Sequence, residues 1–256
     1  MLNMSRTIFA AKFAAWHIFF SVIVALLVAT VVFYFWYPYP YGGLSGGREL
    51  FVIVVLVDVV CGPLLTFILV NPKKSRRETV GDLFLVVLIQ FSALAYGTWT
   101  TWQARPSYLV LEVDRFKVVS LSALDPVTLG GLSSDLAPSF FGGVKVVALR
   151  PPKSVEEKNK VLFESIEFGR DYSVRPEFYI PYKGDAALRS LNRALPINAF
   201  LKRFPLQQSN VEELSRIQKI PLSDVMYLPV LGREDWIALL DKDGVIYGFL
   251  RGDGFF

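Results

Sequence analysis

The sequence predicts a membrane α protein with a soluble α+β part: three transmembrane helices followed by a small α+β domain with a mostly antiparallel sheet. Although 53% of the chain is hydrophobic, its long apolar runs all fall within the first hundred residues. Each run is about as long as the roughly 20 residues that a helix needs to cross a bilayer. After Gln103 the pattern changes to strand-like alternation, helix caps and turns. We therefore divide the chain into a three-helix transmembrane region, 1–102, and an α+β region, 103–256.

The first span is expected at 13–37, with the amino end in the cytoplasm. Its apolar run is longer than the core of a secretory signal peptide and no A-x-A pattern follows it, so we expect it to be retained. Aromatic residues at 34–37 close the span, as they often do at a membrane interface. We interpret His17, in the inner third of this span, as a hydrogen-bonding partner of Thr66 or Ser21; a functional role is the alternative.

The second span, expected at 50–70, contains one ionisable residue, Asp58, close to its middle. An acid at that depth is costly and is by default a functional hypothesis. Gly62 and Pro63 follow in the inner half, where a proline frees a backbone carbonyl and tends to kink the helix. Because Asp58 and Gly62 are four residues apart, they share one helix face, and the glycine permits close approach of another helix.

A basic cluster follows the second span and consists of Lys73, Lys74, Arg76 and Arg77. Such clusters remain in the cytoplasm, so we interpret these four residues as topology determinants. Attraction to anionic lipid or to a cytoplasmic assembly protein is a secondary interpretation. Three spans that start inside leave the carboxyl end outside. The sequence therefore predicts a multi-pass protein of a bacterial inner membrane, with residues 103–256 in the periplasm.

The third span is expected at 80–102, and Gln90 lies near its centre, at a depth similar to that of Asp58. One interpretation is that Asp58 hydrogen-bonds Gln90 and stabilises the helix bundle, as polar pairs between membrane helices commonly do. The other is that Asp58, with Gly62 and Pro63, contacts a partner helix or takes part in proton transfer.

Strands are expected in three places after the last span. The alternation over 109–119 predicts one strand, a Gly/Ser/Pro-rich loop follows over 120–143, and 144–149 predicts another strand. Near the end, 236–240 and 245–250 flank a turn in which Gly244 can take a positive φ, which predicts a hairpin.

Helices are expected between these strands. Ser154 with Glu157 forms a capping-box pattern that predicts a helix to residue 168, with Gly169 as its stop. Asp185 is expected to cap a short helix that ends before residue 196. Ser209 with the acid at 212 repeats the capping pattern and predicts a helix that ends before residue 221.

Composition excludes several kinds of chemistry. Cys61 is the only cysteine and His17 the only histidine, so neither an intramolecular disulfide nor a multi-histidine metal site can form. The glycines at 42–47 do not fit a phosphate-binding G-x-G-x-x-G pattern. Residues 103–256 contain 20 Lys/Arg and 19 Asp/Glu, so the net positive charge of the chain is poor evidence for nucleic-acid binding. We therefore expect no catalytic, cofactor-binding or metal-binding residues and no nucleic-acid partner.

An intramembrane protease is the enzymatic alternative, because two membrane aspartates can share a proton and hydrolyse peptides. The available pair is Asp58 and Asp82. Asp82 is expected at the cytoplasmic edge of its span, and a rise of about 1.5 Å per residue then separates the two acids by many ångströms along the membrane normal. A Ser–Lys hydrolase in the outer region has no mark in the sequence. We expect no enzyme.

Several stretches, in the right order, resemble the TfpX/TfpZ family of type IV pilin accessory proteins. They read YPYPYGGLSGGRELF, VDVVCGPLLTFILVNPKK, DLFLVVLIQFSALAYG, ARPSYLVLEVDRFKVV and, near the end, LPVLGREDWIALLDKDG. The resemblance is dense over 37–119 and loose over about 120–225. It implies a chaperone-like inner-membrane helper of a cognate major pilin, acting on pilin stability, presentation or pilus assembly, with no enzymatic activity.

The identity of the pilin, the assembly step and the oligomeric state are left open by the resemblance. The alternative from another class is a three-span sensor or scaffold whose periplasmic domain binds a different ligand. Besides the suspected pilin, the expected partner is the lipid bilayer.

Overall fold

The computed structural model describes residues 4–255 and divides into two compact units. The first unit contains the chain up to Phe35 together with Gly46–Ala104. The second contains Trp36–Ser45 and the chain from Arg105 onwards. The first unit is helical and the second is an α+β domain, which confirms the predicted fold class.

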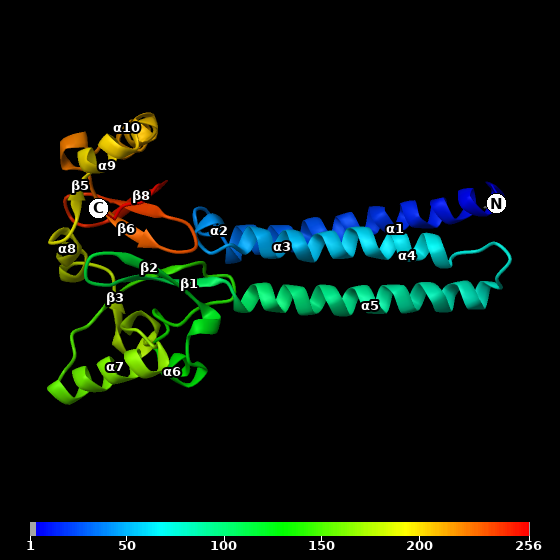
Figure 1. Cartoon of the computed structure of the whole chain (residues 1–256), viewed down its shortest axis with the longest axis horizontal. Coiled ribbons are helices and arrows are strands. Elements are labelled where there is room, and N and C mark those ends of the chain that lie inside the picture. Colours follow the sequence, from blue (N-terminus) through cyan, green and yellow to red (C-terminus); the bar gives the residue numbers. More distant parts are fainter. Residues whose placement is uncertain (1–3, 256) are drawn as a thin grey trace. The chain divides into compact units, whose positions relative to one another are not determined.

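Three helical segments make up the first unit (Figure 1). Each segment has a stretch that is long and apolar enough to cross a membrane, namely Arg6–Trp36, Phe51–Leu69 and Arg76–Gln103. The three predicted spans are thus confirmed by length and composition. The elements are α1 (Met4–Val31) continued by the π-helix η1 (Val32–Trp36), then α3 (Gly47–Leu56), the π-helix η2 (Val57–Cys61) and α4 (Gly62–Leu69), and finally α5 (Arg76–Gln103).

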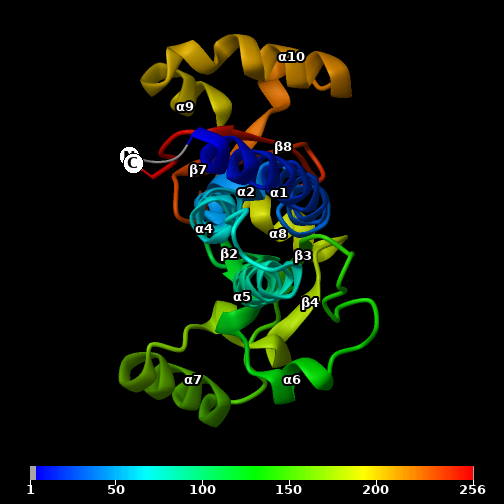
Figure 2. The ribbon, with the colours of Figure 1, turned by 90° about the vertical axis from the view of Figure 1, so that its right-hand side faces the viewer.

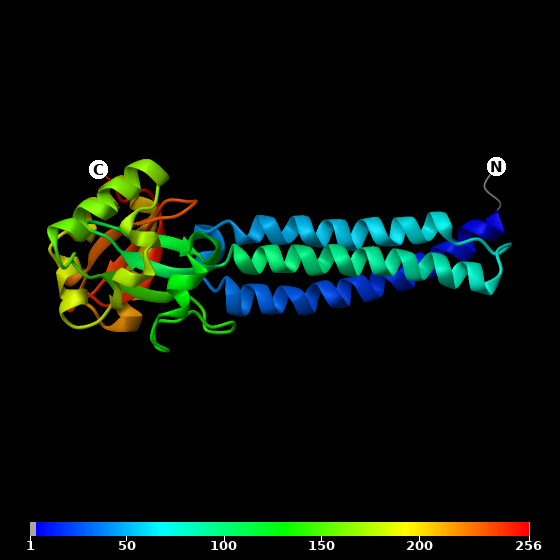
Figure 3. The same ribbon diagram turned by 90° about the horizontal axis from the view of Figure 1, so that it is seen from below.

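The second span lies between the other two. α1 packs along α4, while α3 and α4 both pack along α5, and Figure 3 shows the three segments running side by side. Small residues allow part of this packing. A Cβ added at Gly97 of α5 would lie 2.7 Å from a methyl group of Val54, which is closer than atoms approach in real structures.

The third span starts at a capping box that we had not predicted. The Ser75 hydroxyl accepts a hydrogen bond from the backbone N–H of Glu78 (3.3 Å), and the Glu78 carboxylate accepts one from the backbone N–H of Ser75 (2.8 Å). These bonds satisfy two of the N–H groups that a helix start leaves open. Glu78 also places a negative charge at the positive end of the helix dipole, which offsets the unfavourable position of Arg76 and Arg77 there.

Residues 36–45, the 36–45 loop, connect the first two spans and belong to the second unit, together with the short helix α2 (Tyr41–Leu44). Leu44 is fully buried and its carbonyl accepts a hydrogen bond from the backbone N–H of Arg233 (2.6 Å). Tyr41 packs edge-to-face on Phe249. The sequence-based division at 102/103 places this loop in the transmembrane region, because in the sequence it is a short connection between two predicted spans.

Eight strands form one mixed, mostly antiparallel sheet in the order β4-β3-β1-β2-β6-β7-β8, with β5 also paired to β6. Only β1 with β3 and β2 with β6 are parallel among the described pairs. The strands are β1 (Pro106–Leu111), β2 (Phe116–Ser120), β3 (Lys145–Leu149), β4 (Tyr179–Pro181), β5 (Leu195–Pro196), β6 (Met226–Leu231), β7 (Trp236–Leu240) and β8 (Ile246–Arg251).

Hydrophobic residues cover both faces of this sheet. On β7, Trp236, Ala238 and Leu240 join a cluster that includes Tyr41 and Leu44. The alternate residues of the same strand join a second cluster with α9 (Ile197–Arg203) and α10 (Gln208–Gln218). Figure 2 shows α9 and α10 near β8, and α6 (Pro126–Gly130) with α7 (Val155–Phe168) below β3 and β4. Burial on both sides explains why the central strands read as continuous apolar runs.

The single strand predicted over 109–119 is wrong, because β1 and β2 form a hairpin there. Leu111 pairs with Phe116, and the Glu112 N–H donates to the Arg115 carbonyl (2.9 Å) across the turn. Val113 between Glu112 and Asp114 continues the strand alternation in the sequence, but these residues form the turn. The strand over 144–149 and the hairpin around Gly244 are confirmed, and Gly244 has φ 75°.

The helix predicted after Ser154 is confirmed as α7. The Ser154 hydroxyl accepts a hydrogen bond from the Glu157 N–H (3.2 Å), and Gly169 ends the helix with φ 64°. Helices also occur at the two other predicted places, but their expected caps do not form. α8 (Asp185–Leu191) is preceded by Gly184, and α10 starts before Ser209. Short helices within 120–143 and at 197–203 were not predicted.

Two arginine–carboxylate pairs fix α7 to the domain. Arg150 binds both carboxylate oxygens of Glu157 (2.8 and 3.0 Å) and stacks on the ring of Phe178. Hydrogen bonds from Arg150 and from the Lys153 backbone N–H lower the pKa of Glu157 to about 2. Arg175, whose side chain is buried, binds Glu164 (2.7 Å), which lowers the pKa of that carboxyl as well.

Candidate functional site

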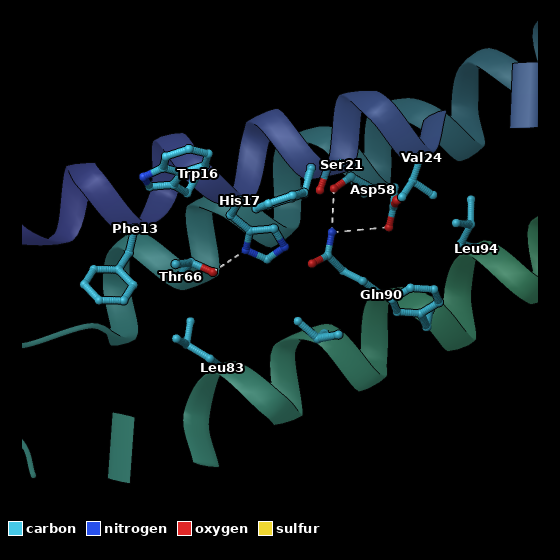
Figure 4. A pocket seen from close by; sticks show the side chains of 13 residues that line it. Phe13, Trp16, His17, Ser21, Val24, Asp58, Thr66, Leu83, Gln90 and Leu94 are labelled. Carbon is cyan, nitrogen blue, oxygen red and sulfur yellow. Dashed lines mark hydrogen bonds between the residues drawn. The ribbon is translucent and has the colours of Figure 1, made fainter. Parts of the chain in front are cut away.

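The candidate site is a groove in the first unit. α1 and α5 form its sides and the second span forms its floor. We call it the α1–α5 groove; its volume is about 470 Å³. Aromatic and aliphatic side chains form its walls and polar side chains its floor (Figure 4). The lining residues are Phe13, Trp16, His17, Phe20, Ser21, Val24, Asp58, Thr66, Leu83, Val87, Gln90, Phe91 and Leu94.

A π-helical turn places Asp58 at the groove. The turn, η2, ends directly before Gly62 and Pro63. Pro63 has no N–H to donate to the preceding turn and its ring crowds the carbonyl four residues earlier, so a wider turn relieves the clash. The kink expected at Gly62-Pro63 therefore takes the form of a π-helix, and the Asp58 side chain is only 7% exposed within it.

Gln90 joins the third span to this turn. Its Nε2 donates to the backbone carbonyl of Asp58 (2.7 Å) and to the carboxylate oxygen Oδ1 of Asp58 (3.3 Å). The hydrogen bond expected between these two side chains is present, but the shorter bond goes to the backbone. Gly62 makes room for the amide, because a Cβ there would lie 2.1 Å from atoms of Gln90.

His17 forms the other polar contact on the groove floor. Its Nδ1 lies 2.6 Å from the hydroxyl of Thr66, so the first and second spans share a hydrogen bond. Of the two expected partners, the structure selects Thr66; Ser21 is buried nearby and also lines the groove. In Figure 4 the His17 ring and the Gln90 amide point toward one another across the floor.

One polar atom of this floor lacks a partner. The Gln90 Oε1 is buried and accepts no hydrogen bond from any residue that the structure describes. The orientation of the amide follows from chemistry, because the group facing the Asp58 carbonyl must be the donating NH₂. A buried acceptor without a donor is unfavourable, and each such atom needs an explanation.

The basic residues predicted to set topology lie outside the groove. Lys73 and Lys74 belong to the connection between α4 and α5, and Arg76 and Arg77 form the first turn of α5. The Lys74 Nζ binds the Asp82 carboxylate (2.5 Å) and the carbonyl of Leu69 (3.1 Å). Asp82 is thus paired with Lys74 of the connection before α5 and does not line the groove with Asp58.

Sequence reasoning found the polar floor but missed the walls. The aromatic side chains of Phe13, Trp16, Phe20 and Phe91 point at a common space only because α1 and α5 both pack on the second span. A sign was available in the sequence: in α1, residues 13, 16, 17, 20, 21 and 24 follow helical spacing and so share one face. What the sequence did not show is which face of α5 they meet.

Three apolar helices with a polar-floored groove, followed by an α+β domain, define a small multi-span membrane protein. Comparison with known proteins is more specific. A family described as "Fimbrial assembly protein FimB" matches residues 5–46. Two fimbrial assembly proteins of Dichelobacter nodosus, of serogroups I and E1, are 33% and 32% identical to the chain over 262 residues, which is 99% of each protein. A third, of serogroups C1 and C2, is 43% identical over 119 residues, 46% of this chain and 91% of its own length.

The chain belongs to the fimbrial assembly protein family, because its similarity to the relative of serogroup I runs along its whole length. No solved structure matches the chain.

Proposed function

We propose that the protein is a chaperone-like accessory protein of the bacterial inner membrane that serves a cognate type IV pilin, within the TfpX/TfpZ group that its sequence resembles. The observation that carries this proposal is the 33% identity to a fimbrial assembly protein over 99% of both chains. The helper acts on pilin stability, presentation or pilus assembly, and the major pilin is its partner.

We propose that the amino end is cytoplasmic and the α+β domain periplasmic. The basic cluster at 73–77, between the second and third spans, supports this orientation. A second argument comes from the 36–45 loop. Since Leu44 is buried in the core of the α+β domain, loop and domain lie on the same side of any membrane that the helices cross. Two crossings, by the second and third spans, separate them in the chain, which agrees with that requirement.

We propose a binding role rather than an enzymatic one. Asp58 is held by the amide of Gln90, and the acid that a protease would require next to it, Asp82, is instead paired with Lys74. The groove therefore provides hydrogen-bonding groups for recognition but no shared-proton carboxylate pair.

Deletion of the gene tests the proposed function. We expect fewer surface pili, a changed level of pilin on a blot, and recovery of pilin with a tagged full-length chain after solubilisation. Unchanged piliation together with no recovered pilin would overturn the proposal. For orientation, a reporter fused after Arg77 should be active only in the cytoplasm, and one fused after Phe256 only in the periplasm; the reverse result from either fusion would overturn the three-span arrangement.

A sensor or scaffold is the second candidate, and one feature of the α+β domain favours it. A pocket of about 1040 Å³ lies at the ends of the parallel strands β1 and β3. Its charged lining residues are the basic Arg115, Arg150, Lys158, Arg189 and Arg193 and the acidic Glu112, Asp114 and Asp171, so basic residues are in excess. Recovery of a small anionic ligand with the purified protein, without pilin, would favour this function over the first.

A further inference from the structure

We propose that the α1–α5 groove receives the transmembrane helix of the pilin, and that this helix places a hydrogen-bond donor against Gln90 Oε1. This inference rests on the proposed function and identifies the site at which the helper holds its partner. It follows from the shape of the groove, the chemistry of its floor and the state of the other polar groups on the three spans.

The length of the groove matches about three turns of a helix. It runs along residues 13–24 of α1 and 83–94 of α5, about three helical turns of each, or roughly 16 Å at the usual rise per residue. The second span forms its floor, so the three spans leave open the position that a fourth helix would take. A polypeptide in the hydrocarbon must satisfy its own backbone hydrogen bonds, so a chain that enters here is a helix.

The floor requires a partner that donates hydrogen bonds. Gln90 Oε1 is buried and has no donor among the residues described, and the Asp58 carboxyl lies beside it. A lipid tail can fill the space between the aromatic walls but has no N–H or O–H group. A helix that carries a hydroxyl, amide or amine at this depth satisfies the acceptor, and such contacts between membrane helices are favourable.

A second copy of this chain is a poor occupant, because hydroxyls on its exposed helix faces are already used. Thr30, Ser92 and Thr100 each donate to the backbone carbonyl four residues earlier in their own helix (2.9 Å). Two copies that met through their grooves would bring the Gln90 Oε1 acceptors of both copies to the same interface. The complementary donor therefore comes from a different protein, and the proposed function supplies one.

Photocrosslinking tests the groove directly. The residue p-benzoylphenylalanine is placed in the full-length chain at Phe20 or Phe91, which line the groove and are 58% and 60% exposed. The controls are Ile18 and Ile89, two residues away on the same helices, 44% and 53% exposed and outside the groove lining. Since two residues turn a helix by about 200°, each control faces the opposite side. We expect crosslinks to pilin from positions 20 and 91 but not from 18 and 89.

A blocking substitution gives a second readout. Val87→Trp fills the groove, whereas Leu85→Trp adds the same side chain to the outer face of α5. At equal abundance of the two variants, we expect Val87→Trp to lower pilin recovery by roughly tenfold relative to Leu85→Trp. Gln90→Met, which keeps the length of the side chain but removes the acceptor, should lower recovery as well.

The possible outcomes separate the two proposals. If pilin is recovered with the protein but crosslinks equally at all four positions, the groove assignment is overturned while the accessory function stands. The same conclusion follows if pilin is recovered but only lipid or a second copy crosslinks in the groove. If pilin recovery is the same for Val87→Trp and Leu85→Trp, the groove assignment is overturned as well. If no pilin is recovered and deletion leaves piliation unchanged, the accessory function itself fails.

Discussion

The Gln90 amide donates to the backbone carbonyl of Asp58 at 2.7 Å and to the carboxylate of the same residue at 3.3 Å. The stronger link between the second and third spans therefore does not depend on the Asp58 side chain. This separates two roles that sequence alone left open, because Asp58 can be replaced while the shorter interhelical bond is kept.

The first prediction compares Gln90→Leu with Asp58→Leu. Gln90→Leu removes the donor of both bonds, whereas Asp58→Leu keeps the carbonyl acceptor. With about 1 kcal/mol for each bond between membrane helices, Gln90→Leu should lower the Tm of the detergent-solubilised full-length protein more than Asp58→Leu. Asp58→Asn, which retains a side-chain acceptor, is the control and should stay near wild type. An equal fall in Tm in Gln90→Leu and Asp58→Leu would show that the hydrogen bond to the Asp58 carboxylate contributes most of the stability.

The second prediction concerns pilin and uses the same position. Asp58→Leu should leave the abundance of the protein nearly unchanged but weaken pilin recovery and surface piliation, since the groove floor loses its carboxyl. Blots for the protein and for recovered pilin measure the two effects. A fall in the protein's own abundance would assign Asp58 to bundle stability, and normal values in both blots would remove it from both roles.

The third prediction tests close packing at Gly62. A Cβ at this position would lie 2.1 Å from the Gln90 amide, so Gly62→Ala must displace Gln90 or separate the helices. Gly81→Ala in α5 is the matched control, because a Cβ there meets nothing within 4 Å. We expect overpacking at Gly62 to cost about 1–3 kcal/mol, measured as a lower Tm, with little change at Gly81. An unchanged Tm in Gly62→Ala would contradict the close contact between Gly62 and the Gln90 side chain.

The fourth prediction concerns acid stability of the α+β domain. Because Arg150 holds the pKa of Glu157 at about 2, below its ordinary value of 4.5, the folded state binds this proton less readily than the unfolded state. Its contribution is complete above about pH 4.5 and is lost as the pH falls toward 2. In Glu157→Gln, the free energy of unfolding in urea should therefore depend less on pH between about 4.5 and 2 than it does in the wild type. The same slope in wild type and Glu157→Gln would rule out the pair as a source of the dependence.

The fifth prediction tests the 36–45 loop as part of the α+β core. A chain of residues 105–256 lacks Tyr41 and Leu44 and exposes the surface that they cover, so it should unfold at lower urea than a chain in which 36–45 is joined to it by a flexible linker. Burial of one such side chain is worth about 1.5–3 kcal/mol. Leu44→Asp in the joined chain should remove the gain. Equal stability of both chains would show that the loop is only a connection.

The sequence was sufficient for features governed by local rules. Apolar length predicted the three spans, and cap chemistry predicted α7 with its stop at Gly169. Polar residues at one depth predicted the contact between Asp58 and Gln90. The features it missed depend on residues far apart in the chain. Residues 112–115 have the alternating pattern of a strand, and only the pairing of β1 with β2 shows that they form a turn. Leu44 is buried by residues of β6 and β7, which come much later in the chain.

The place of Leu44 also has a consequence for how the protein is made. Its carbonyl accepts a hydrogen bond from the backbone N–H of Arg233, a residue that is synthesised after all three spans. The core of the α+β domain therefore forms only after all three spans have been made, and a chain that stops early leaves Tyr41 and Leu44 uncovered. If only one of the second and third spans crossed the membrane, the loop and the α+β domain would lie on opposite sides, so this core forms only when both spans cross.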